Sequence, residues 1–173
     1  MFSFSDETKA KLRNRVVWSR LVGWALLCYA AAIYGGVVTA PAIPEWYAGL
    51  TKPWFSPPNW LFAPVWTTLY AMIAAAIWIA VEFDRSGAEK AQKLRLQLLF
   101  VFQMVLNGLW SWAFFGQKSP AIALAILAIL LLTGIVTLRI FASRRPLAAW
   151  LFLPYVVWLS FAGLLNAAIV RLN

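Results

Sequence analysis

Residues 121–141 read AIALAILAILLLTGIVTLRIF, an apolar run with a single charge, Arg139, close to its end. About 20 consecutive apolar residues are enough for a helix to cross the hydrocarbon core of a bilayer. Immediately before the run, Ser119 and Pro120 are residue types that cap and start a helix. The run therefore predicts a membrane-spanning helix that begins sharply after a short connection.

Four more stretches have the same character, at residues 17–39, 61–81, 96–115 and 147–169. Hydrophobic residues make up 63% of the 173 residues and charged residues only 12%, far from the usage of soluble domains. We therefore expect an all-α integral membrane protein, with a bundle of five transmembrane helices in residues 16–173. The third and fourth helices must be antiparallel neighbours because their connection is very short. No room is left for a second, soluble catalytic domain.

The net charge of +9 would suggest nucleic-acid binding in a soluble protein, but the basic residues are unevenly distributed. Twelve of the fifteen lie in or near the N-terminal tail, the connection after the second span or the connection before the fifth. Lysine and arginine gather on the cytoplasmic side of membrane proteins. We therefore predict a basic cytoplasmic tail over residues 1–15, an extracytoplasmic C-terminus, a bacterial inner membrane as location, and no nucleic-acid partner.

A cleaved signal peptide is the alternative interpretation of the first span, because residues 38–40 loosely resemble a cleavage site. Its apolar run is longer than a typical signal core, and Pro41 would directly follow the cut. We therefore expect the span to be retained.

The segment between the first two spans, residues 41–60, is too apolar for an ordinary solvated loop. It is also too rich in proline for a helix. We expect it to fold as a structured cap over one end of the bundle, where it would roof a ligand pocket. The cap residues are Trp46, Tyr47, Pro53, Trp54, Pro57 and Pro58.

The polar side chains exclude several kinds of chemistry. The chain has no histidine, which is the commonest haem ligand and a frequent zinc ligand. Its six acidic residues fall in tails, connections or span ends, whereas proton-coupled exporters need an ionisable group within the membrane. We therefore expect no metal site, no cofactor and no hydrolytic or metal-based catalysis, and binding rather than enzymatic activity.

One helix face of the last span carries unusual residues. Trp158 falls near the middle of the membrane, where an interfacial aromatic belt does not explain it. Ala162 and Asn166 follow at intervals of four and share its face. Trp66 likewise lies more than one turn inside the second span. Large rings beside an alanine would make a pocket for a flat apolar ligand.

A second such face lies in the third span, where Gln103, Asn107 and Trp110 follow the spacing of one helix side. Side-chain amides in hydrocarbon need hydrogen-bond partners, so both faces should point into the bundle. The alternative is that Gln103, Asn107 and Asn166 merely join helices to one another. Small residues four apart, such as Ala31 and Gly35, favour close helix contact within one chain or between two copies.

Taken in order, these residues resemble the TspO/MBR family of tryptophan-rich sensory proteins and translocator proteins, also called peripheral benzodiazepine receptors, in its bacterial form. The resemblance covers essentially all of residues 17–173. The motifs that carry it are Trp46-Tyr47-x-x-Leu50-x-Lys52-Pro53-x-x-x-Pro57-Pro58, Trp66-x-x-x-Tyr70, Gln103-x-x-x-Asn107-x-x-Trp110 and Pro154-Tyr155-x-x-Trp158-x-x-Phe161-Ala162.

The resemblance implies a five-helix protein of the lipid bilayer, commonly a homodimer, that binds porphyrins and benzodiazepine-site ligands in a pocket covered by the first connection. The positions that match the family's pocket are Trp46, Trp66, Asn107, Trp158 and Ala162, and Trp110 lies on the same helix face as Asn107. The ligand-binding residues that we expect are Trp46, Trp66, Asn107, Trp110, Trp158 and Ala162.

We accordingly expect a receptor-like protein that binds a tetrapyrrole, such as protoporphyrin IX or a haem-like pigment, for sensing, transport or disposal. One alternative implied by the resemblance is light-dependent porphyrin degradation that uses Trp66 and Trp158. Another is a structural membrane protein that regulates partner complexes. Sterol binding is not expected, because residues 164–171 lack the tyrosine of the sterol motif in animal members.

Overall fold

The computed structural model describes residue 10 and residues 14–173, and the described part is helical without strands. Five helices are each long and apolar enough to cross a membrane, so the chain is a multi-pass membrane protein. The prediction of an all-α five-helix bundle is confirmed. The predicted tail, residues 1–15, lies almost wholly outside the described residues. The helices are α2 (Arg15–Thr39), α3 (Asn59–Glu82), α4 (Lys90–Ser111), α5 (Pro120–Arg144) and α6 (Pro146–Leu172).

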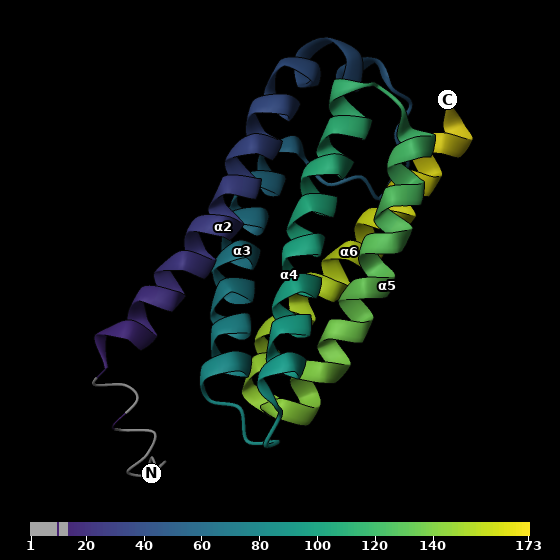
Figure 1. Cartoon of the computed structure of the whole chain (residues 1–173). Coiled ribbons are helices and arrows are strands. Elements are labelled where there is room, and N and C mark those ends of the chain that lie inside the picture. The colour runs from purple at the N-terminus through teal and green to yellow at the C-terminus, as the bar shows by residue number, and fades with distance from the viewer. Residues whose placement is uncertain (1–9, 11–13) are drawn as a thin grey trace.

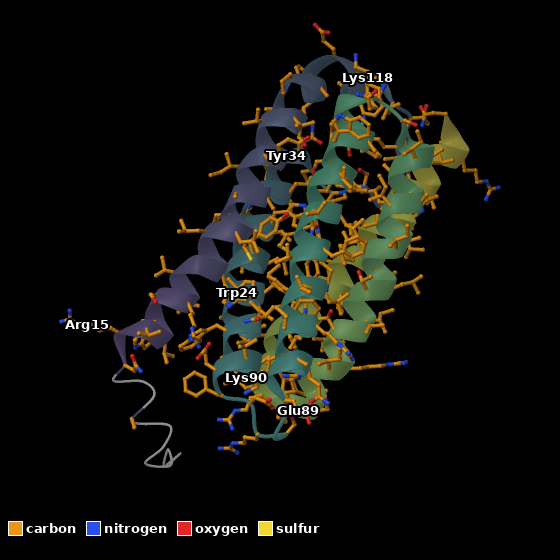
Figure 2. The ribbon with its side chains drawn as sticks, in the orientation of Figure 1. Arg15, Trp24, Tyr34, Glu89, Lys90 and Lys118 are labelled. Carbon is orange, nitrogen blue, oxygen red and sulfur yellow. The ribbon has the colours of Figure 1, made fainter. Side chains whose placement is uncertain are left out.

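The helices form a closed ring in which each packs on two neighbours, in the order α2, α3, α6, α5, α4 and back to α2 (Figure 1). The antiparallel pairing of α4 with α5 is confirmed, with Ser119 at the N-cap position and Pro120 as the first helical residue. We call one end of the bundle the basic end; it holds the start of α2, the connection 83–89 and Arg145. The cap end has residues 40–58, the connection 117–119 and the C-terminus. Figure 2 marks the two ends by Glu89 and Lys90 below and by Lys118 above.

Helix α4 begins at Lys90, six residues earlier than the predicted span, because Glu89 caps it. The Glu89 side chain accepts a hydrogen bond from the third backbone amide of the helix. In return, the backbone N–H of Glu89 donates to Gln92 Oε1 at 3.2 Å. This reciprocal capping lets a charged segment, residues 90–95, form the first turns of the helix.

The cap differs from the prediction in its first part, which is helical. After α2 the chain continues through a 3₁₀ turn, η1 (Ala40–Ala42), and a π-helical turn, η2 (Ile43–Tyr47). Pro41 and Pro44 lie in these turns and cannot donate a backbone N–H. The helix therefore changes its hydrogen-bond pattern instead of ending.

The remainder of the cap, residues 50–58, is tied to the last residue of the chain. The Thr51 N–H donates to Asn173 Oδ1 at 3.0 Å, and Asn173 Nδ2 donates back to the Thr51 carbonyl at 3.1 Å. Lys52 Nζ donates to the carbonyls of Ala48 and Leu50 at 3.3 and 3.1 Å. The bonds between Thr51 and Asn173 hold the cap against the end of α6, and those of Lys52 stabilise the cap itself.

At the basic end, α2 is fastened to α3 by two contacts. The Trp78 indole N–H donates to the Val17 carbonyl at 2.8 Å, and Arg20 pairs with Glu82 at 2.9 Å. Toward the cap end the small residues Ala31, Ala32, Gly35 and Gly36 of α2 border a cavity instead.

Candidate functional site: a cavity beneath the cap

A cavity of about 370 Å³ lies at the cap end, between α2, α3, α4 and α6 and beneath η1 and η2. Its volume falls in the range of small-molecule sites, roughly 300–1,000 Å³. Five of the residues expected from the sequence to bind a ligand line it, namely Trp66, Asn107, Trp110, Trp158 and Ala162. Their convergence is a feature of the structure, and their role in binding stays a prediction.

Two tryptophans make an aromatic corner of this cavity. The rings of Trp66 and Trp158 are nearly perpendicular, with centroids 6.5 Å apart. Tyr70 stacks on Trp66 with centroids at 5.4 Å, and Phe62 packs edge-on against Trp158 at 6.0 Å. Aromatic faces and edges arranged in this way favour a flat aromatic ligand.

The wall that α2 contributes consists of small residues. Ala31, Ala32, Gly35 and Gly36 all line the cavity. A Cβ atom at Gly35 would lie 3.1 Å from the Ser111 hydroxyl oxygen, so α2 and α4 approach closely there. The spacing of Ala31 and Gly35 therefore has a role within one chain.

The cavity opens on its side, between α2 and α3. Gly36 of α2 and Ala63 and Thr67 of α3 line the cavity and are nevertheless exposed on the surface of the isolated chain. These residues lie within the helices that are long enough to cross the membrane. This exposed rim between α2 and α3 therefore faces the lipid phase.

Polar groups of α4 and α6 bridge the helices behind the aromatic wall. Gln103 Nε2 donates to the Thr137 hydroxyl at 2.7 Å, and Gln103 does not line the cavity. For Gln103 the helix-joining alternative is thus the one that the structure supports. Trp110 Nε1 donates to Asn166 Oδ1 at 3.2 Å, and Asn166 Nδ2 donates to the Pro120 carbonyl at 2.8 Å.

Asn107 both joins helices and faces the cavity. Its Nδ2 donates to the Tyr155 hydroxyl at 2.7 Å and to the Gln103 carbonyl at 2.9 Å. No described residue donates to its Oδ1, which leaves an acceptor in the wall. The Trp158 indole N–H is a buried donor without a partner among the described residues. A ligand with a hydrogen-bond donor on its rim could satisfy the Asn107 oxygen, whereas the Trp158 nitrogen is not exposed to the cavity.

The cap covers the cavity with its helical part and not with its proline-rich part. Tyr47, only 5% exposed, lines the cavity together with Ala40 and Ile43. Trp46 lies one layer further out and packs edge-on against Phe114, with centroids 5.5 Å apart.

Five of the six predicted cap residues make no part of the cavity wall, namely Trp46, Pro53, Trp54, Pro57 and Pro58. Trp54 is 96% exposed, so the expectation that it roofs the pocket is wrong. Its neighbour Phe55 turns inward instead and packs against Phe161 of α6, with ring centroids 6.4 Å apart. Residues missed from the sequence include Phe62, Ser111 and Leu165, whose types are common in membrane helices and carry no distinguishing signal.

The described residues bring together no group of three or more histidine, cysteine, aspartate or glutamate side chains that could hold a metal ion. The residues that line the cavity supply aromatic surface and a few hydrogen-bonding groups. Trp66 and Trp158 are in contact with each other in its wall, and their photochemical role stays a prediction.

Comparison with known proteins agrees with this arrangement. A model of the TspO/MBR family matches residues 24–172. The tryptophan-rich protein TspO of Archaeoglobus fulgidus is 39% identical over 89% of this chain and 97% of its own. The tryptophan-rich sensory protein of Cereibacter sphaeroides is 35% identical over 87% of this chain and 92% of its own. The translocator protein of Bos taurus is 36% identical over 86% of this chain and 87% of its own. The chain belongs to the TspO/MBR family.

Proposed function

We propose that this protein is a receptor-like membrane protein that binds a porphyrin-type tetrapyrrole in the cavity beneath the cap, for sensing, transport or disposal of the pigment. The observation that carries the proposal is the aromatic corner of Trp66 and Trp158, which faces a wall of small residues on α2. A flat ring fits between a wide aromatic surface and a wall without bulky side chains. Family membership and the relatives' names support a receptor-like role in the membrane.

The side opening supports the same ligand class. Porphyrins are large, flat and apolar over most of their surface, so they partition into membranes. A site entered between α2 and α3 would take such a molecule from lipid, while the polar edge of the pigment would meet Asn107.

The test is a titration of the purified protein in lipid nanodiscs with protoporphyrin IX, followed by the pigment's absorption. Saturable binding is expected in the wild type. Trp66→Phe with Trp158→Phe should weaken it about fivefold or more, because each ring loses aromatic contact worth roughly 0.5–1.5 kcal/mol. The matched control is Trp54→Phe with Trp150→Phe, which changes two exposed rings that do not line the cavity. Equal affinity in the two double variants would refute the assignment of the site.

A second function, light-dependent breakdown of the bound pigment, is favoured by one observation. Trp66 and Trp158 lie in contact within the wall, where two oxidisable indoles would adjoin the same ligand. Illumination of the complex should then bleach the pigment faster than illumination of free pigment in empty nanodiscs. Equal rates would leave binding as the function and remove degradation.

A further inference from the structure

At the basic end, far from the cavity, two connections that are distant in sequence lie side by side. The backbone N–H of Arg85, in the connection 83–89, donates to the carbonyl of Arg144 at the end of α5, at 3.3 Å. Figure 1 shows this teal connection beside the turn between α5 and α6 at the bottom of the bundle. The backbone thus brings Arg85 next to the pair Arg144 and Arg145.

The neighbouring carboxylate, Asp84, already has partners for both of its oxygens. Its side chain is 1% exposed and pairs with Arg144 at 3.4 Å and with Lys93 at 3.6 Å. Both the hydroxyl and the backbone N–H of Ser86 donate to it, at 2.7 and 2.8 Å. Burial raises the pKa of Asp84, but these hydrogen bonds and the charges of Arg144 and Lys93 outweigh it, so the pKa lies below its ordinary value.

Arg85 and Arg145 have no such partner among the described residues. Glu82 pairs with Arg20, and Glu89 caps α4. Partial burial and then the positive charge of Arg85 lower the pKa of Arg145 below its ordinary value. The backbone contact therefore places two arginines beside each other, and no carboxylate among the described residues compensates them.

The surroundings of this pair are those of a membrane interface. Leu147 and Trp150, in the first turns of α6 directly after Arg145, are 55% and 70% exposed. Exposed tryptophan at the end of a membrane-spanning helix is typical of the headgroup level. An anion at Arg85 and Arg145 would thus lie at headgroup depth, near the exposed apolar residues of the first turns of α6.

We propose that Arg85 and Arg145 bind the phosphate of an anionic phospholipid whose acyl chains lie along the start of α6. Guanidinium groups bind phosphate with charge-assisted, often bidentate hydrogen bonds. A net anionic lipid is favoured over a zwitterionic one because Arg144 and Lys93 share a single carboxylate and leave an excess of positive charge. The site is independent of the cavity and of the function proposed for it.

The test uses native mass spectrometry of the full chain in detergent, titrated with phosphatidylglycerol or phosphatidylcholine. Arg85→Gln with Arg145→Gln should weaken phosphatidylglycerol binding roughly tenfold, because both phosphate contacts are lost. The control, Lys90→Gln with Arg139→Gln, removes two exposed charges elsewhere in the basic regions and should weaken it less than about threefold. Equal losses of phosphatidylglycerol affinity in the two double variants would show diffuse attraction and overturn the proposal. Equal binding of phosphatidylcholine and phosphatidylglycerol by the wild type would overturn it as well.

Two further measurements test the uncompensated charges and the identity of the anion. Arg85→Glu should abolish phosphatidylglycerol binding and raise the thermal stability of the lipid-free protein, because the new carboxylate neutralises Arg145. A lowered stability of that folded variant would contradict the account of two uncompensated charges. Inorganic phosphate should not displace phosphatidylglycerol from the wild type, and displacement would identify a site for free phosphate instead of lipid.

Discussion

Asn166 offers the sharpest test of how the cavity wall is held together. The residue is 2% exposed and connects three parts of the chain, since it accepts from Trp110 of α4 and donates to the Pro120 carbonyl at the start of α5. Asn166→Ala removes both hydrogen bonds and leaves the Trp110 indole N–H without its acceptor. Hydrogen bonds between helices in membranes contribute on average about 0.6 and at most about 1.7 kcal/mol each, so we expect a loss of roughly 1–3 kcal/mol.

The assay is equilibrium unfolding in mixed micelles, followed by far-UV circular dichroism. A double-mutant cycle of Asn166→Ala with Trp110→Phe should give a coupling of about 0.6–1.7 kcal/mol, because phenylalanine removes the indole donor. The matched control is Asn59→Ala, at an exposed residue whose side chain makes no hydrogen bond to a described residue; it should cost at most about 0.5 kcal/mol. Zero coupling, or equal losses at Asn59 and Asn166, would refute the reasoning.

Two further predictions concern the cavity and the basic end. Gly35→Leu should abolish porphyrin binding measured by absorption, because the leucine side chain would fill the cavity. The circular dichroism spectrum should stay unchanged, because the new Cβ would lie 3.1 Å from the Ser111 hydroxyl oxygen and the serine side chain can adapt. Wild-type binding by this variant would argue against the α2 wall. Because the pKa of Asp84 is lowered in the folded chain, its stabilising contribution is present at neutral pH and is lost as the pH falls below about 4. Asp84→Asn should therefore flatten the decline of stability in acid, and an unchanged pH profile would contradict the role of this carboxylate.

The helices were predictable because hydrophobic length alone identifies a membrane span. The ends of the helices were harder to predict, because capping residues determine where a helix begins. The charged residues after Glu89 are typical of a loop, but they form the first turns of α4. The cap was predicted as a loop from residue 41, whereas prolines change the helical hydrogen-bond pattern there without ending the helix. A propensity that disfavours α-helix does not reveal which other helical turn takes its place.

For the cavity, helical periodicity predicted that Asn107, Trp158 and Ala162 point into the bundle, and all three line the cavity; their role in binding stays a prediction. The same reasoning fails in the cap, where no period tells which way a side chain points, and Trp54 turns outward. The sequence reveals the small residues of α2, but such a pattern is as typical of close packing as it is of open space. Only the arrangement of α2 against α3 and α4 distinguishes the two.

The most direct test of the central claim is an experimental structure of the protein with protoporphyrin IX in a lipid environment. The account predicts density for the pigment within the cavity, in contact with the rings of both Trp66 and Trp158 and covered by Tyr47. Density for the pigment on the lipid-facing surface, with the cavity unoccupied, would contradict it.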